Sequence, residues 1–272
     1  MRKTVQPQII TNKLVRPLIV AHRGASALAP ENTLAAFRRA IDDGADGIEF
    51  DVRLARDGVA VVFHDPTLIR TALREGSISN YTSAELANID AGSWFNKKTR
   101  LNSNPSYEKQ SIPSLTETLE FLKEFKGVIY IELKCEDSEV EDLVSAVCSA
   151  CKESRLSRQI IIKSFRIAVI PRVRVLCPDL KTAALFAPKI MTMLRKEKHL
   201  VNIAEEFGAS ELSIHYSLAT HKLMEKAGKS GLPVTIWTAD NLRWVKRGIK
   251  LGLNAIITNN PAKLLAKRSE IL

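Results

Sequence analysis

The chain has 272 residues, of which 45% are apolar and 26% are charged, a composition that excludes disordered, collagen-like and low-complexity classes. The net charge of +10 is unevenly distributed: residues 1–158 carry −1 (21 basic, 22 acidic), and residues 159–272 carry +11 (19 basic, 8 acidic). A basic half predicts an anionic partner such as a phosphate compound, a membrane surface or nucleic acid, although a solvated basic surface would have the same composition.

Nothing in the sequence predicts insertion into a membrane or export across one. The chain has no run of about 18 apolar residues, and its basic N-terminus lacks the apolar region of a signal peptide. Four cysteines are too few for a disulfide scaffold, so we predict a reduced, cytoplasmic protein. The pair Cys148-x-x-Cys151 lies in a predicted helix without a second pair at metal-binding spacing, and we interpret it as structural.

Eight apolar, β-rich runs alternate with helical segments along the chain. They are mostly continuous rather than alternating in polarity, as expected for parallel strands that are buried on both faces. The runs cover residues 18–23, 47–52, 128–134, 161–166, 181–186, 211–215, 234–239 and 254–259, with helices predicted at 31–44, 114–127 and 221–231. This alternation predicts an α/β protein, a single (β/α)8 TIM barrel that spans residues 1–272.

Two features distort the predicted barrel after its second strand. A ninth run, 59–64, follows after only Arg56-Asp57-Gly58, which is too short for a parallel crossover and predicts an antiparallel β-hairpin. This hairpin would pair Asp51 with Phe63 and bring His64 beside Glu49 and Asp51. Residues 66–112 are too many for an ordinary loop, so we predict a small inserted cap or lid there.

Charged residues follow the predicted strands at the end where barrel active sites lie. Glu49 and Asp51 point to the same face because they are two residues apart, and so do Glu132 and Lys134. Three inward carboxylates, with Arg23 and Lys134 as the nearby cations, predict a site for a hard divalent cation, Mg2+ or Ca2+. A metal-free salt-bridge network of the same residues is the alternative interpretation.

Two histidines accompany these carboxylates. Histidine as a residue type titrates near neutral pH, so the pair His22 and His64 can serve as general acid and general base. Arg23 and Lys134 would then contact phosphate oxygens. We interpret His199, His215 and His221 as structural or exposed; the alternative for His215, which lies near a strand end, is that it lines the same mouth.

An ordered set of motifs resembles the glycerophosphodiester phosphodiesterases. The motifs are HRGAS at 22–26, PENTLAAF at 30–37, DGIEFDVRLARDGVAVVFHD at 46–65, DAGSWF at 90–95, IPSLTETLEFL at 112–122, IELK at 131–134 and WT at 237–238. The resemblance implies a distorted TIM barrel that hydrolyses deacylated phospholipids to glycerol 3-phosphate and an alcohol, with a role in lipid and glycerol metabolism.

The resemblance also implies roles for individual residues. His22 and His64 become the acid/base pair, Glu49, Asp51 and Glu132 the metal ligands, and Arg23 and Lys134 the phosphate contacts. Trp237 becomes an apolar wall for the glycerol or the leaving group.

The sequence departs from the family pattern at three places. One glycine follows Arg70-Thr71 where the family has a glycine-rich stretch, Lys163 replaces a small or apolar residue, and Asn259 follows Thr258 where an aspartate is common. An additional cation at Lys163 would favour a more anionic substrate or shift the phosphate pocket.

Two other functions fit parts of the sequence. A lysophospholipase D would need an open apolar groove that leads from residues 66–112 to Trp237. A non-catalytic module for anionic surfaces would use the basic half, and the basic, partly apolar segment 187–200 predicts weak membrane contact. We predict a small phosphodiester as the partner and no nucleic acid, because no nucleic-acid-binding motif is present; the sequence leaves the oligomeric state open.

Overall fold

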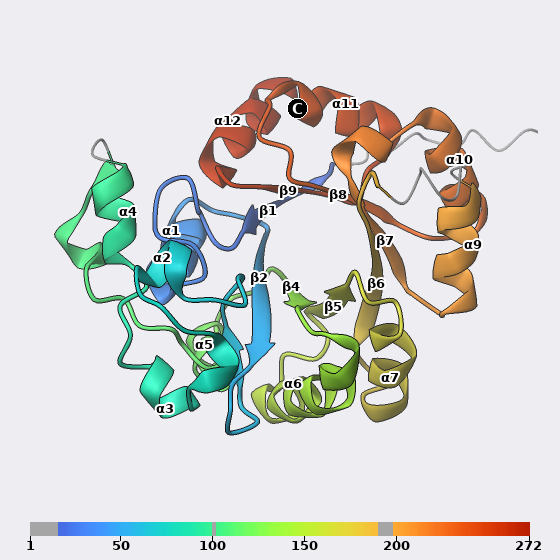
Figure 1. Ribbon diagram of the computed structural model, residues 1–272. Helices are drawn as coiled ribbons and strands as arrows, with labels where there is room; N and C mark the ends of the chain where they lie inside the picture. The colour runs from blue at the N-terminus through green and yellow to red at the C-terminus, as the bar shows by residue number, and fades with distance from the viewer. Residues whose placement is uncertain (1–15, 100–101, 190–197) are drawn as a thin grey trace, which may run out of the picture.

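The computed structural model describes residues 16–99, 102–189 and 198–272. In these residues, eight parallel strands close into a barrel surrounded by helices (Figure 1). The barrel strands are β1 (Leu18–His22), β2 (Gly47–Leu54), β4 (Val128–Leu133), β5 (Ile160–Ser164), β6 (Lys181–Phe186), β7 (Glu211–His215), β8 (Val234–Trp237) and β9 (Ala255–Thr258). Strand β1 closes the barrel by pairing with both β9 and β2. The predicted (β/α)8 architecture is confirmed.

Amphipathic helices cover the outside of the barrel. They are α1 (Leu34–Asp42), α5 (Leu115–Phe121), α6 (Val140–Ser154), α7 (Val169–Leu176), α9 (Lys198–Glu206), α10 (His221–Lys229), α11 (Arg243–Leu251) and α12 (Pro261–Ile271). Their apolar faces and the outward side chains of the strands form two large buried clusters. Helix α1 begins after its N-cap Thr33, whose hydroxyl accepts from the Ala36 amide, so it starts later than the predicted residue 31.

The ninth strand forms the predicted hairpin. Strand β3 (Ala60–Val62) runs antiparallel to β2, with Val52 opposite Val62. The Phe63 amide donates to the Asp51 carbonyl over 3.0 Å, which confirms the predicted register. The hairpin therefore brings His64 back toward the carboxyl end of the barrel.

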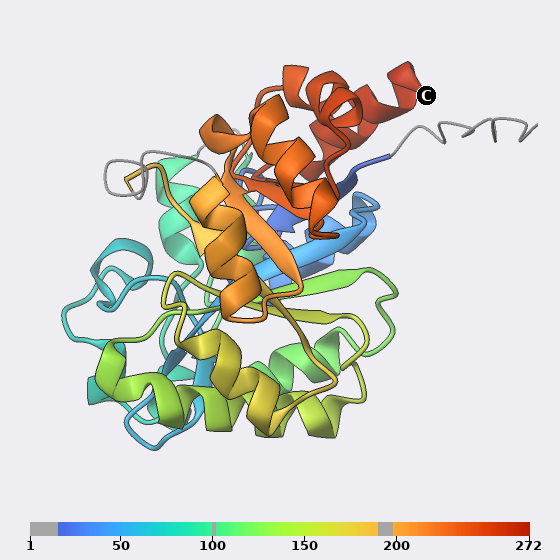
Figure 2. The same cartoon turned by 90° about the vertical axis from the view of Figure 1, so that its right-hand side faces the viewer.

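Residues 66–99 and 102–112 form a set of short helices beside the barrel mouth. They are α2 (Ile69–Ala72), α3 (Ser83–Leu86) and α4 (Ser93–Lys98), with 3-10 turns at Ile78–Asn80 and Pro105–Tyr107. Figure 2 places α2 on the side of the barrel where the strands end. The segment has its own apolar cluster, and Phe95 and Tyr107 pack in a second cluster with Ala36 of α1.

The remaining sequence features have simple structural counterparts. All four cysteines are buried and unpaired, and burial raises the pKa of Cys148 to about 12, as expected for a structural thiol. In the described residues, no helix is long and apolar enough to cross a membrane. Most of the segment predicted to touch membranes, residues 190–197, lies outside the described residues.

Candidate active site

Three carboxylates converge inside the carboxyl end of the barrel. Glu49 and Asp51 follow each other on the inner face of β2, and β4 places Glu132 directly beside Asp51. One oxygen from each lies within 4.8 Å of the other two. The side chains are 0%, 1% and 7% exposed, respectively. Buried carboxylates at this spacing need cations to balance them.

Three cationic side chains, rather than the predicted two, contact these carboxylates. Arg23 Nε lies 3.2 Å from Asp51 Oδ2, and Lys134 Nζ lies 3.4 Å from Asp51 Oδ1 and 2.5 Å from Glu132 Oε1. The third cation is Lys163, whose Nζ lies 2.8 Å from Glu49 Oε1. The prediction that Arg23 and Lys134 are the nearby cations was therefore incomplete: alternation along β5 directs Lys163 inward, beside Glu132.

These contacts decide the ionisation of the cluster. Burial alone would raise the pKa of Glu49, but the Lys163 ammonium and His22 outweigh it and lower that pKa. Burial is likewise overcome at Asp51, whose pKa is held far below its usual range by Arg23 and Lys134. Burial opposes the charge on Lys163, but Glu49 and Glu132 raise its pKa. These contacts therefore favour the ionised forms of Glu49, Asp51 and Lys163.

The loop after β1 contacts the carboxylates, and its backbone adopts positive φ angles. Arg23 and Gly24 have φ of +55° and +79°, and a Cβ on Gly24 would lie 2.6 Å from the Ala36 carbonyl carbon, so glycine is required there. The Arg23 amide donates to Glu49 over 3.1 Å, and Asn32 Nδ2 donates to Asp51 over 3.0 Å. Asn32 also has positive φ, +57°, a conformation that asparagine adopts more readily than most residues.

His22 projects from the end of β1 with a defined tautomer. Its Nδ1 lies 2.7 Å from Asn259 Oδ1, while Asn259 Nδ2 donates to Asp240 over 2.7 Å. Since an amide oxygen can only accept, Nδ1 carries a proton. Nε2 then lies 3.9 Å from Glu49 Oε2, on the side of the carboxylates. Asn259 is recognisable in the sequence as a departure from the family pattern, but its contact with His22 and the part played by Asp240 are not.

His64 lies beyond the hairpin and is oriented by a carboxylate. Its Nδ1 is 2.5 Å from Asp65 Oδ1, and Arg70 Nε donates to Asp65 over 2.6 Å. Arg70 lowers the pKa of Asp65 to about 2 despite partial burial. Burial, with Arg23 and Lys134, lowers the pKa of His64, although Asp51 and Asp65 oppose this shift. A neutral imidazole with a fixed ring is therefore present near pH 7.

Glu31 links the two histidine-bearing loops. Its carboxylate lies 2.7 Å from Arg23 Nη1 and 2.8 Å from Arg70 Nη2. The motif PENTLAAF at 30–37 includes Glu31, but the sequence did not single out Arg70, Asp65 or Glu31. The signal available in the sequence was their position: Asp65 and Arg70 follow His64 along the chain, and Glu31 lies just before α1.

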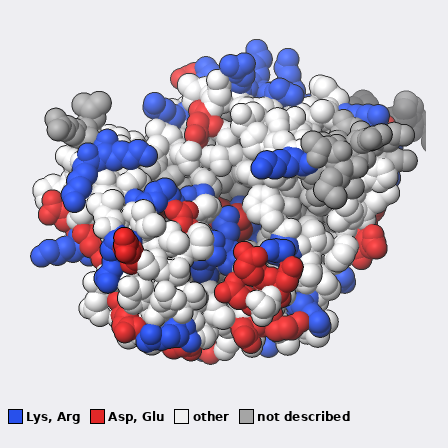
Figure 3. All heavy atoms as spheres, in the orientation of Figure 1, with Lys and Arg blue, Asp and Glu red and all other residues white. Residues whose placement is uncertain are grey.

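Aromatic side chains form another wall of the mouth. Trp237, at the end of β8, packs edge-on against Phe165 and His215, with ring centroids 5.5 and 5.4 Å apart. Lys134 Nζ lies 5.6 Å from the centre of the Phe165 ring, so this wall adjoins the charged cluster. His215 thus contacts Trp237, the side chain that was predicted to form an apolar wall of the site. Acidic and basic atoms lie side by side at the centre of this face (Figure 3).

The carboxylate cluster has the donors that a hard divalent cation needs. Glu49 Oε1, Asp51 Oδ1 and Glu132 Oε1 are buried and make no well-formed hydrogen bond, although each lies within ion-pair distance of a lysine. Oxygen ligands of this kind fit Mg2+ or Ca2+, and the described residues place no thiolate among them. The cluster could hold a metal ion through these three side chains.

The match to a protein family agrees with this geometry. The model of the glycerophosphoryl diester phosphodiesterase family matches residues 22–263, from the first histidine of the site into α12. The chain belongs to the glycerophosphoryl diester phosphodiesterase family. The sequence-based identification of a phosphodiesterase is therefore confirmed.

Individual relatives and solved structures are similar to this chain over most of its length. A glycerophosphodiester phosphodiesterase from Caldanaerobacter subterraneus is 33% identical over 92% of this chain and 97% of the relative. An Oleispira antarctica phosphodiesterase, solved with the product sn-glycerol-3-phosphate, superposes with a TM-score of 0.80 at 26% identity, over 93% of this chain and 97% of the other. The enzyme from Agrobacterium tumefaciens superposes with a TM-score of 0.74 at 28% identity, over 92% and 99%.

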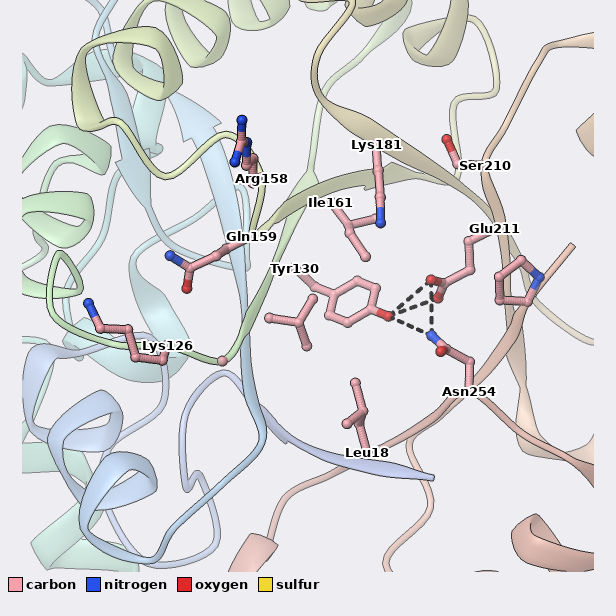
Figure 4. A pocket seen from close by; sticks show the side chains of 13 residues that line it. Leu18, Lys126, Tyr130, Arg158, Gln159, Ile161, Lys181, Ser210, Glu211 and Asn254 are labelled. Carbon is pink, nitrogen blue, oxygen red and sulfur yellow. Dashed lines mark hydrogen bonds between the residues drawn. The ribbon is translucent and has the colours of Figure 1, made fainter. Parts of the chain in front are cut away.

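A different cavity, of about 380 Å3, opens at the amino end of the phosphodiesterase barrel. Figure 4 shows Tyr130, Glu211 and Asn254 joined by hydrogen bonds on one side of it. Tyr130 Oη donates to Glu211 over 2.9 Å, and Asn254 Nδ2 donates to Glu211 over 3.2 Å. Burial raises the pKa of Glu211 from its ordinary 4.5 to about 7, against the opposing effect of its hydrogen bonds.

Glu211→Gln is expected to change how stability depends on pH. Between pH 4.5 and about 7, the folded chain holds a proton on Glu211 that the unfolded chain has released. Stability is therefore lost as pH rises through this window, by about 3 kcal/mol when the loss is complete. Urea unfolding at pH 5 and pH 8 should show that the glutamine variant gains stability relative to wild type at pH 8. Equal gains at both pH values would contradict the assignment, and the surface variant Glu225→Gln serves as control.

Proposed function

We propose that this chain hydrolyses glycerophosphodiesters to glycerol 3-phosphate and an alcohol, using His22 and His64 as its acid/base pair. The observation that carries the proposal is that two histidines with oriented rings lie beside the three buried carboxylates of one barrel mouth. The product found in the Oleispira neighbour gives the substrate class.

The chain's own residues supply the proton transfers. One imidazole Nε2 accepts the proton of the nucleophile as its oxygen attacks phosphorus. The other histidine donates a proton to the leaving alkoxide as the phosphorus–oxygen bond breaks. The nucleophile is water or the substrate's own glycerol 2-hydroxyl; the second route passes through a cyclic phosphate that water then opens.

Positive side chains bind and orient the phosphate. Arg23 and Lys134 lie at the open side of the carboxylates, with side chains 16% and 17% exposed, so each can reach a substrate oxygen. Glu49, Asp51 and Glu132 would hold Mg2+ or Ca2+. The bound ion would supply positive charge that polarises the phosphodiester.

The cap formed by residues 66–112 would select the alcohol group. A cavity of about 440 Å3 lies between α4 and the start of α12, and its lining includes Ser26 and Asn259 beside His22. Trp94 and Phe95 give this lining an apolar side, while Lys98 and Lys263 are charged. This mixed lining favours a polar alcohol over an acyl chain. Trp237, which does not line this cavity, is a second proposed contact, for the glycerol or the leaving group.

Release of glycerol 3-phosphate from glycerophosphocholine tests the proposal. We expect release by the purified protein, its loss in EDTA, and its return when Mg2+ or Ca2+ is added. Lysophosphatidylcholine is assayed in parallel for choline release, since activity on it alone would favour the lysophospholipase D function. Vesicle binding with no hydrolysis of either substrate under any metal would overturn the proposal in favour of a non-catalytic module. The cytoplasmic location stays a prediction.

A further inference from the structure

Lys163 occupies an unusual position for a basic side chain. It comes from β5, its side chain is 2% exposed, and it enters the barrel from the side of Glu132. Its Nζ lies 2.8 Å from Glu49 Oε1 and 3.6 Å from Glu132 Oε2. Lysine is almost never fully buried unless it is paired, and here both partners belong to the group of carboxylates that could hold a metal ion.

The charges in contact at this site already balance. Glu49, Asp51 and Glu132 contribute three negative charges, and Arg23, Lys134 and Lys163 contribute three positive charges. Each of these carboxylates lies 2.5 to 3.6 Å from at least one of these cations. Outside these six side chains, Arg23 also contacts Glu31, and Arg70 bridges Glu31 and Asp65. A divalent cation would therefore enter a group of six side chains whose formal charges balance and leave that group with an excess of two positive charges.

Lysine also competes with the ion for the same atom. Glu49 Oε1, the oxygen nearest to Lys163 Nζ, is one of the three buried oxygens that lack a well-formed hydrogen bond. A metal ion bound by this oxygen would have the ammonium as its close neighbour, and like charges at short range in a buried site repel strongly. Binding thus requires the ammonium to move away from Glu49 or an anion to compensate.

On the basis of the proposed function, we propose that Lys163 determines the metal affinity of this enzyme. It makes divalent cations bind weakly to the free protein and more tightly when a phosphate compound binds with them. Glycerol 3-phosphate carries about two negative charges near neutral pH, so a divalent ion and this product together restore the neutral cluster. Lys163 would thereby couple metal binding to substrate and product binding.

Mn2+ binding to the intact protein tests this inference without any turnover. Free Mn2+ is measured by electron paramagnetic resonance for wild type, Lys163→Met, Lys163→Gln and the control Lys181→Met. The control removes the same charge from a lysine that lines the cavity at the opposite end of the barrel. We expect at least ten-fold tighter Mn2+ binding in both Lys163 variants and an unchanged affinity in the control.

The product provides the second arm of the experiment. We expect glycerol 3-phosphate to tighten Mn2+ binding to wild type at least ten-fold and to have a much smaller effect on Lys163→Met. Equal or weaker Mn2+ binding in the folded variants would overturn the inference. If neither variant folds, as judged by circular dichroism, the wild-type result decides. Mn2+ affinity that does not change when glycerol 3-phosphate is added would then overturn the inference.

The two proposals fail separately. Tighter Mn2+ binding in the variants, with no release of glycerol 3-phosphate by wild type, would leave the role of Lys163 standing and refute the proposed reaction. Turnover by wild type, with unchanged Mn2+ affinity in the variants, would support the proposed reaction and refute the role of Lys163.

Discussion

Replacing either His22 or His64 with alanine is expected to lower kcat for glycerophosphodiester hydrolysis by about 10²–10⁴-fold, the usual contribution of a positioned acid or base. Both rings are oriented at Nδ1, by Asn259 and Asp65, so Nε2 is the atom left to exchange a proton with substrate. Neither side chain belongs to the apolar core, so the free energy of unfolding should change little. Steady-state kinetics and urea unfolding measure the two effects.

A matched control is His221→Ala, which removes an exposed histidine at the start of α10. Its kcat should equal that of wild type. Near-normal turnover in His22→Ala or His64→Ala would remove that residue from the mechanism.

The same two variants can separate the acid from the base. A p-nitrophenyl phosphodiester has a leaving group that needs no proton, so loss of the general acid should matter little for its hydrolysis. We expect one variant to recover most of the wild-type rate on this substrate and the other to remain impaired. Recovery in both variants, or in neither, would contradict the division of roles between the two histidines.

Asp51→Asn is expected to have the largest combined effect on activity and stability. Asp51 is 1% exposed and contacts Arg23, Lys134 and Asn32. Removing its charge leaves two cations without their shared partner, and breaking a buried ion pair in this way costs about 3–5 kcal/mol. The substitution also removes one proposed metal ligand, so kcat should fall by at least about 10²-fold.

Thermal unfolding with and without added metal distinguishes loss of metal binding from simple destabilisation. Thermal unfolding of wild type should shift upward when Mn2+ or Ca2+ is added, and folded Asp51→Asn should lose this shift. Asp57→Asn, in the hairpin turn where the side chain accepts from Ser83, makes the same chemical change away from the cluster and should keep the shift. A full metal-induced shift in Asp51→Asn would argue for the metal-free salt-bridge network.

Local patterns in the sequence are enough to predict the architecture and which charged side chains face the interior of the barrel. Continuous apolar runs that alternate with helices identify parallel strands that are buried on both faces. The side-chain period of two then directs Glu49 and Asp51 inward together. The short turn at Arg56-Asp57-Gly58 permits only a hairpin, and the register of Asp51 with Phe63 follows from its length. All of this information is local, within a few residues of each element.

The partners of these residues depend on closure of the barrel. His22 and Asn259 are 237 positions apart and meet because closure of the barrel pairs β1 with β9. Lys163 reaches Glu49 across the interior, although β4 lies between their strands. Tyr130 and Glu211, 81 positions apart, meet at the other end of the barrel. Composition and periodicity describe which face a side chain occupies, whereas contacts across a closed barrel depend on the stagger and proximity of strands that are distant in the chain.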